Sequence, residues 1–191
     1  AGATVVEIPE VAAWRRMGGP SGRLMRYEFK ADLNQYLEQS NAAIGSLEEI
    51  IRFNQANEAT VMPIFGQDIL LKAQAKGSLE DAEYLEALEE SKRLATSAID
   101  STLQEHDLDA LIAPTNSPAW PTDHINGDSF HVGSSSLAAI SGYPSVTVPA
   151  GFVSGLPVGI SFMGAKGHDR QLIGIAHAFE QVARVRRPPD H

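Results

Sequence analysis

The chain has 191 residues, of which 43% are hydrophobic and 20% are charged, a composition typical of a soluble globular protein. Its formal net charge of −9 argues against a nucleic-acid partner, because phosphate backbones attract clustered Lys and Arg. The sequence contains no cysteine, which excludes disulfides, thiolate metal sites, iron–sulfur clusters and a cysteine nucleophile.

No apolar run approaches the roughly 20 residues that a membrane-spanning helix needs, so we expect no membrane partner. The first ten residues lack the charged-then-apolar pattern of a signal peptide, and the cytoplasm is the default location. The chain starts without Met, directly in a strand-like segment, which suggests a truncated or processed chain.

The first part of the chain predicts a strand followed by helices. The β-branched residues of Ala3–Ile8 predict a strand that ends at Pro9. A Gly-rich cluster at 18–22 predicts a turn, and apolar residues spaced three and four apart predict a helix over Arg23–Glu38. Ser46 and Glu49 form a capping box that starts a helix over Leu47–Asn54.

An irregular segment is expected over residues 54–66, followed by two more helices. The first covers Gln67–Lys76 and is stopped by Gly77. The second, about Leu79 to His106, is capped by Ser78 and carries acidic residues in its first turns, where the helix dipole favours them. These acids are interpreted as a solvated helix face rather than a metal site.

The last part predicts the order strand, loop, helix, strand, strand, helix. The expected elements are a strand at 109–113 that ends at Pro114, a helix at 135–141 that is closed by Gly142, and a strand at 146–148 that ends at Pro149. An antiparallel neighbour of that strand is expected at 158–163, and a closing helix at 169–184. Helices that accompany at least four strands indicate an α/β architecture. These elements could close a core of their own or form one edge of a larger sheet.

Cofactor and metal motifs are missing. There is no GxGxxG or GxxxxGK[ST] loop, and the six histidines form no HxH or HExxH spacing. Asp123, His124 and His131 share one loop, but Asp123 and Asp128 in a Gly/Asn-rich loop are typical of turns. We therefore expect no metal and no cofactor.

A serine cluster, Gly133-Ser134-Ser135-Ser136, lies where the long loop meets the helix at 135–141. Helix amides there could stabilise an oxyanion, but a serine nucleophile also needs a base. His131 has no orienting carboxylate that the sequence identifies, and position 137 is Leu rather than the Gly of a GxSxG elbow. A serine that caps the helix is the favoured interpretation.

Three segments in the correct order resemble the amidase-signature enzymes. They are LDALIAPT at 108–115, AISGYPSVTVPAG at 139–151 and LPVGISFMG at 156–164. Upstream, Tyr27–Asn34 and Leu70–Gln74 resemble the peptide-amidase-like branch of this family. The resemblance covers nearly the whole chain, and the combination of three spaced motifs is more specific than any one of them.

The resemblance implies one α/β domain of several hundred residues, with a mixed central sheet flanked by helices. Residues 1–191 would be its C-terminal segment, with no internal domain boundary. The family hydrolyses amide bonds through an acyl-enzyme with a Ser–cis-Ser–Lys triad, in which the lysine and a GGSSGG-type signature lie upstream of the LDALIAPT-like strand. Neither motif occurs here, so no catalytic residue carries over.

What carries over is a pocket wall around the long loop. Its predicted substrate-binding residues are Thr115, Trp120, Gly133, Ser134 and Ser135. Trp120 is the best single candidate for a ligand contact, although it could be an ordinary loop anchor.

The resemblance implies part of an amidase that hydrolyses carboxamide C–N bonds, such as peptide C-terminal amides, and that is inactive without the triad. Its partners would be the amide substrate and the N-terminal part of the same amidase, or a second copy. The alternative is a non-catalytic fragment or binding module that associates through an uncovered sheet face.

Overall fold

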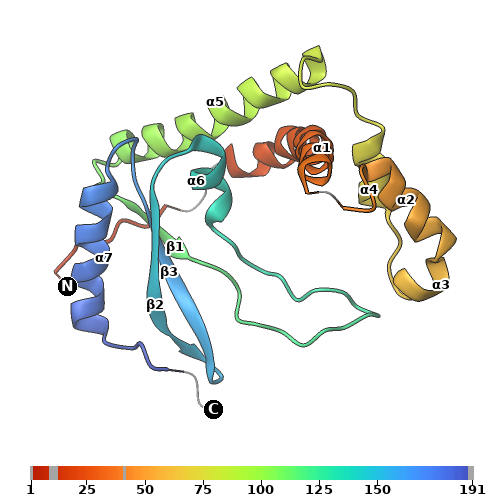
Figure 1. Ribbon diagram of the computed structural model, residues 1–191. Coiled ribbons are helices and arrows are strands. Elements are labelled where there is room, and N and C mark those ends of the chain that lie inside the picture. The colour runs from red at the N-terminus through yellow and green to blue at the C-terminus, as the bar shows by residue number, and fades with distance from the viewer. Residues whose placement is uncertain (1, 9–12, 41, 189–191) are drawn as a thin grey trace. The chain divides into compact units, whose positions relative to one another are not determined.

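The computed structural model describes residues 2–8, 13–40 and 42–188. Contacts divide the chain into two compact units, one formed by residues 17–91 and the other by the residues on either side of that segment. Figure 1 shows the course of the chain. The expectation of a single domain without an internal boundary stays a prediction. Within the described residues, no helix is both long enough and apolar enough to cross a membrane.

Unit 17–91 is helical. It contains most of α1 (Ala13–Gln39), then α2 (Leu47–Ala56), α3 (Glu58–Val61) and α4 (Asp68–Gln74), and the beginning of α5 (Ala82–Glu105). Its small core is built from one helix turn of α2 and one residue of α4, with partly buried side chains around them: Leu47, Ile51 and Ala73, with Leu33 and Leu70. The short α3 lies inside the segment that was expected to be irregular.

The predicted capping of α2 by Ser46 is confirmed, and Glu49 reaches back as predicted but binds the residue before the N-cap. The backbone N–H of Glu49 donates to Ser46 Oγ at 3.2 Å, and Glu49 Oε2 accepts from the backbone N–H of Gly45 at 2.7 Å. Two amides at the start of α2 are thus satisfied by side chains. Helix α2 continues to Ala56, two residues beyond the predicted end.

Two predictions for the first forty residues are wrong. The turn at 18–22 is part of the continuous helix α1, with Pro20 inside it. Pro20 is buried, so packing offsets part of the cost of its missing N–H. The strand at 3–8 does not form. A strand needs a neighbouring strand to pair with its backbone N–H and C=O groups, and no described strand pairs with this segment.

The second unit contains a three-stranded sheet of β1 (Leu111–Pro114), β2 (Ser145–Val153) and β3 (Leu156–Met163). The strand order is β1-β3-β2 and both pairs are antiparallel, so the predicted pairing of the last two strands is confirmed. Strand β2 does not end at Pro149 but continues through a bulge between Pro149 and Gly151. Pro149 is tolerated because β2 lies at an edge, and Gly151 adopts a φ of +147°.

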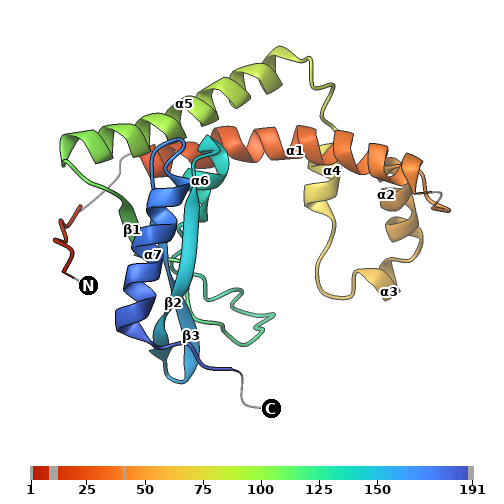
Figure 2. The ribbon, with the colours of Figure 1, turned by 60° about the vertical axis from the view of Figure 1, so that its left-hand side comes forward.

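One face of the sheet packs against α7 (Asp169–Ala183), which runs beside β2 and β3 in Figures 1 and 2. The core there is apolar and includes Val148, Phe162, Leu172 and Ala176. The rings of Phe162 and Phe179 meet edge to face at 5.8 Å. Helix α6 (Ser135–Ser141) has the predicted bounds and ends at Gly142, whose φ is +73°. These elements form the α/β architecture that the sequence predicts.

Candidate functional site

The long loop between β1 and α6 leaves and re-enters the sheet region through a narrow neck. The carbonyl of Thr115 accepts from the backbone N–H of Ser134 at 3.2 Å, and Asn116 pairs with Gly133 in an isolated bridge. The backbone N–H of Ser117 donates to the Val132 carbonyl at 3.0 Å. Three of the predicted site residues, Thr115, Gly133 and Ser134, therefore lie together at this neck (Figure 1).

A row of hydroxyl groups crosses the sheet beside the neck. Ser161 Oγ lies 2.9 Å from Thr115 Oγ1 and 2.9 Å from Thr147 Oγ1, so the row joins the end of β1, the middle of β3 and β2. Three hydroxyls carry three hydrogens, and the two bonds of the row use two of them. One O–H is therefore left to donate outside the row. Ser161 is only 4% exposed, which leaves Thr115 or Thr147 as the accessible donor.

Gly159 makes room for this row. A Cβ at position 159 would lie 2.8 Å from Thr115 Oγ1 and 3.1 Å from Thr147 Cγ2, closer than side chains normally approach. The site residues predicted from the sequence do not include Gly159, Thr147 or Ser161. The sequence did carry a signal for part of this set. Side chains alternate between the two faces of a strand, so residues two apart, such as Gly159 and Ser161, share one face.

The predicted serine cap of α6 is confirmed in its position but not in its hydrogen bond. Ser134 occupies the N-cap position, but its side chain makes no capping hydrogen bond. Its φ of −114° and ψ of 3° are not the extended geometry of a capping serine, and its Oγ points to the Thr115 carbonyl at 3.5 Å. Ser134 is 1% exposed, whereas Ser135 is exposed at the first position of α6.

The serine cluster has no base in the described part of the chain. His131 Nε2 lies 3.1 Å from Ser129 Oγ, and neither Ser134 nor Ser135 is hydrogen-bonded to an imidazole, carboxylate or amine there. The neck can donate hydrogen bonds to a carbonyl group, but it offers no group that would take a proton from these serines.

Trp120 lies in the body of the loop rather than at the neck. Its Nε1 donates to Asp128 Oδ1 at 3.2 Å, and its ring meets Phe130 edge to face at 6.3 Å. Phe130 in turn reaches the neck, because a Cβ on Gly133 would lie 2.9 Å from Phe130 Cζ. Trp120 is half-buried by these contacts. They suit a loop anchor, and its role as a ligand contact stays a prediction.

The tip of the loop is a turn, as its composition predicts. Asp123 Oδ1 accepts from the backbone amides of Ile125 and Asn126, each at 2.9 Å. Hydrogen bonds from Asn126, first from its backbone and then from its side chain, lower the pKa of the Asp123 carboxyl. Within the described residues, no group of three or more His, Asp and Glu side chains could hold a metal ion.

Comparison with known proteins identifies the family. The family model described as Amidase matches residues 4–173, almost the whole chain. The chain belongs to the amidase family. This agrees with the resemblance of its three spaced motifs to the amidase-signature enzymes.

Individual relatives cover nearly all of this chain. The crystal structure of native peptide amidase from Stenotrophomonas maltophilia is 42% identical, with a TM-score of 0.82 over 97% of this chain and 37% of its own. A probable amidase of Arabidopsis thaliana is 35% identical over 165 residues, which are 85% of this chain and 29% of the relative. Indoleacetamide hydrolase of Pseudomonas savastanoi is 31% identical over 82% of this chain and 33% of its own length. The chain thus spans about a third of the length of these relatives.

Proposed function

We propose that this chain forms part of an amidase that hydrolyses carboxamide C–N bonds, with peptide C-terminal amides as the candidate substrates. The observation that carries the proposal is the 42% identity, at a TM-score of 0.82, to a peptide amidase over 97% of the chain. Indoleacetamide hydrolase, whose name also specifies a carboxamide, supports the same bond type.

In this proposal the chain supplies a wall of the substrate pocket. Thr115, Gly133 and Ser134 lie at the loop neck, and Ser135 follows as the first residue of α6. Trp120 contacts the neck through Phe130. An amide substrate presents a carbonyl acceptor and N–H donors. The unused hydroxyl hydrogen of the Thr115 row and the exposed Ser135 can bind the carbonyl, and the Trp120 ring offers an apolar surface.

Residues 1–191 do not include the GGSSGG-type signature of the family triad, so we infer that this segment alone does not hydrolyse amides. The test measures ammonia release from an N-acylated dipeptide amide. The natural full-length protein should turn the substrate over, the 191-residue chain should not, and mixing the chain with the rest of the amidase domain should restore activity.

Ser135→Ala and Ser136→Ala form a matched pair for this test, since both positions lie in the first turn of α6 and are exposed. Neither should abolish turnover by the full-length protein. If the isolated chain shows turnover that is lost in Ser135→Ala but kept in Ser136→Ala, the proposal that this segment supplies only a pocket wall is overturned. A full-length protein that releases no ammonia from any carboxamide would overturn the proposed activity.

The alternative is a binding module that associates through the uncovered side of its sheet. Within the described residues β1 is paired only with β3, and Ile112 on β1 is 48% exposed. An unpaired edge of this kind can accept another strand. Sedimentation of the chain tests this association: self-association that Ile112→Lys removes supports the module, and a stable monomer at high concentration contradicts it.

A further inference from the structure

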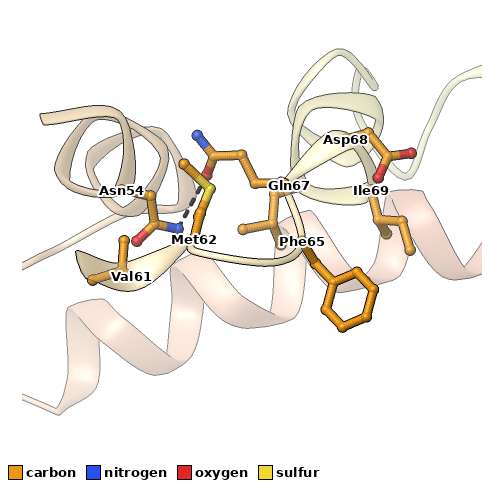
Figure 3. Close-up of a pocket in the computed structure, with 9 residues that line it drawn as sticks. Asn54, Val61, Met62, Phe65, Gln67, Asp68 and Ile69 are labelled. Atoms are coloured by element: carbon orange, nitrogen blue, oxygen red, sulfur yellow. Dashed lines mark hydrogen bonds between the residues drawn. The ribbon is translucent and has the colours of Figure 1, made fainter. Parts of the chain in front are cut away.

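A cavity of about 250 Å³ lies within unit 17–91, where the end of α2 faces the segment from α3 to α4. It is separate in sequence from the loop neck described above. Nine residues line it: Asn54, Val61, Met62, Phe65, Gly66, Gln67, Asp68, Ile69 and Leu70. Figure 3 shows the amides of Asn54 and Gln67 facing each other beside Met62.

The two amides position each other and keep hydrogen-bonding capacity. Asn54 Nδ2 donates to Gln67 Oε1 at 3.0 Å, and Gln67 Nε2 donates to the Ile51 carbonyl at 3.1 Å. Each NH₂ group has a second hydrogen, and Asn54 Oδ1 accepts no hydrogen bond from the described residues. The cavity therefore presents an acceptor and up to two donors from side chains that are already oriented.

The rest of the lining favours a neutral, apolar ligand. Val61 and Ile69 are 43% and 65% exposed, and Met62 and Leu70 are half-buried. Asp68 is the charged residue of the lining, and Lys72 Nζ pairs with it at 2.7 Å. A free carboxylate or ammonium group on the ligand would thus find no unpaired opposite charge among these residues.

We propose that this cavity binds a neutral ligand that joins an apolar group to an amide, the chemistry of an apolar residue within a peptide. The ligand amide would exchange hydrogen bonds with Asn54 Oδ1 and the free NH₂ hydrogens, and its apolar group would cover Val61, Met62 and Ile69. The volume exceeds the roughly 150 Å³ of an apolar cavity that binds benzene, so it can hold one side chain with its amide. This proposal rests on the cavity and is independent of the proposed catalytic function.

The test is a titration of the natural full-length protein with N-acetyl-L-leucine N-methylamide, which lacks the primary carboxamide of the proposed substrates, followed by calorimetry and by the side-chain amide NMR signals of Asn54 and Gln67. We expect saturable binding that shifts both signals. N-acetylglycine N-methylamide, which lacks the apolar group, and N-acetyl-L-leucine, which carries a carboxylate, should each bind at least about tenfold more weakly, a difference of about 1.4 kcal/mol.

Substitutions separate the amide from the apolar contribution. Asn54→Leu should weaken binding about tenfold, while Gln55→Leu, which also replaces a side-chain amide by leucine but at the neighbouring exposed position of α2, should leave it unchanged. Ile69→Asp tests the apolar wall without touching the amide pair, and its 65% exposure makes a folding defect no concern. Far-ultraviolet circular dichroism of each variant checks the helices.

Three results would overturn the proposal. They are shifts that grow linearly without saturation, equal binding by the wild type and Asn54→Leu, and a full-length structure in which another part of the same protein fills the cavity. The last result would make the cavity an internal packing surface rather than a ligand site.

Discussion

Thr115 Oγ1 lies 2.9 Å from Ser161 Oγ, although the two residues are 46 positions apart. Thr115 begins the long loop that carries Trp120, and Ser161 is buried in the middle of β3. The backbone N–H of Thr115 also donates to the Gly159 carbonyl at 2.9 Å. Two hydrogen bonds to the sheet therefore position the start of the loop. Substitutions in β3 should for this reason displace the backbone at the neck.

Gly159→Ala should destabilise the protein and displace the loop neck. The new methyl group would meet Thr115 Oγ1 at 2.8 Å and Thr115 Cβ at 3.2 Å, and the second of these atoms cannot move without the backbone. Overpacking of this kind costs about 1–3 kcal/mol. Urea denaturation measures the free energy of unfolding, and the backbone NMR signals of Thr115 and Ser134 report the displacement.

The matched control is Gly174→Ala in α7, where a Cβ meets no atom within 4 Å. Alanine is the better helix former, so this change should stabilise the protein by about 0.5–1 kcal/mol. Equal effects of the two substitutions would show that the contact with Thr115 is not what makes position 159 sensitive.

Ser161→Ala should cost about 1 kcal/mol of stability, because it removes the shared partner of two hydroxyls. Thr147 is exposed and can turn to water, so most of the loss should fall on Thr115, which is half-buried. Ser145→Ala, an exposed position on β2, is the control and should be neutral. Equal unfolding free energies for the wild type and Ser161→Ala would contradict a role of the row in stability.

Local signals in the sequence predicted much of this fold. The bounds of α6 follow from a loop-to-helix junction and Gly142, and the start of α2 follows from Ser46 and Glu49. The turn between β2 and β3 predicts their antiparallel pairing. Each of these signals acts within a few residues, which is the range over which sequence patterns determine structure.

The errors concern features that depend on distant residues. Ala3–Ile8 has the composition of a strand but no described strand beside it, and the turn residues at 18–22 are incorporated in α1 with Pro20 buried. The hydroxyl row needs the register of both strand pairs, which sets Ser161 opposite Ala113 and Thr147. No pattern within β1, β2 or β3 alone specifies that register.

Trp120→Ala should raise KM of the full-length amidase for an apolar peptide amide about fivefold with little change in kcat, if Trp120 contacts the substrate as proposed. An aromatic contact of about 1 kcal/mol corresponds to that ratio. Trp120→Phe keeps a ring against Phe130 but loses the donor to Asp128 and should change KM much less. A lower unfolding free energy with unchanged KM would make Trp120 a loop anchor only.

A cluster in unit 17–91 predicts how stability depends on pH. Tyr27 Oη donates to Glu83 Oε2 at 2.7 Å, and Lys76 Nζ lies 2.9 Å from Glu83 Oε1. The hydrogen bond to Glu83, followed by burial, raises the pKa of Tyr27 to about 12. The hydrogen bond from Tyr27, followed by that from Lys76, lowers the pKa of Glu83 below its ordinary value of 4.5.

Tyr27→Phe should therefore reduce the loss of stability at both ends of the pH range. Because folding lowers the pKa of Glu83, this carboxylate contributes stability that is fully present above pH 4.5, the ordinary pKa of a glutamate. That stability is lost as the pH falls through the lowered pKa of the folded state. The raised pKa of Tyr27 gives stability that is present below 10.0 and is lost as the pH rises toward about 12. Denaturation midpoints measured across this pH range give the loss of stability at the acid and the alkaline end. In an absorbance titration of tyrosinate, the step at the highest pH should be missing in the variant. Superimposable pH profiles for the wild type and Tyr27→Phe would contradict the coupling between Tyr27 and Glu83.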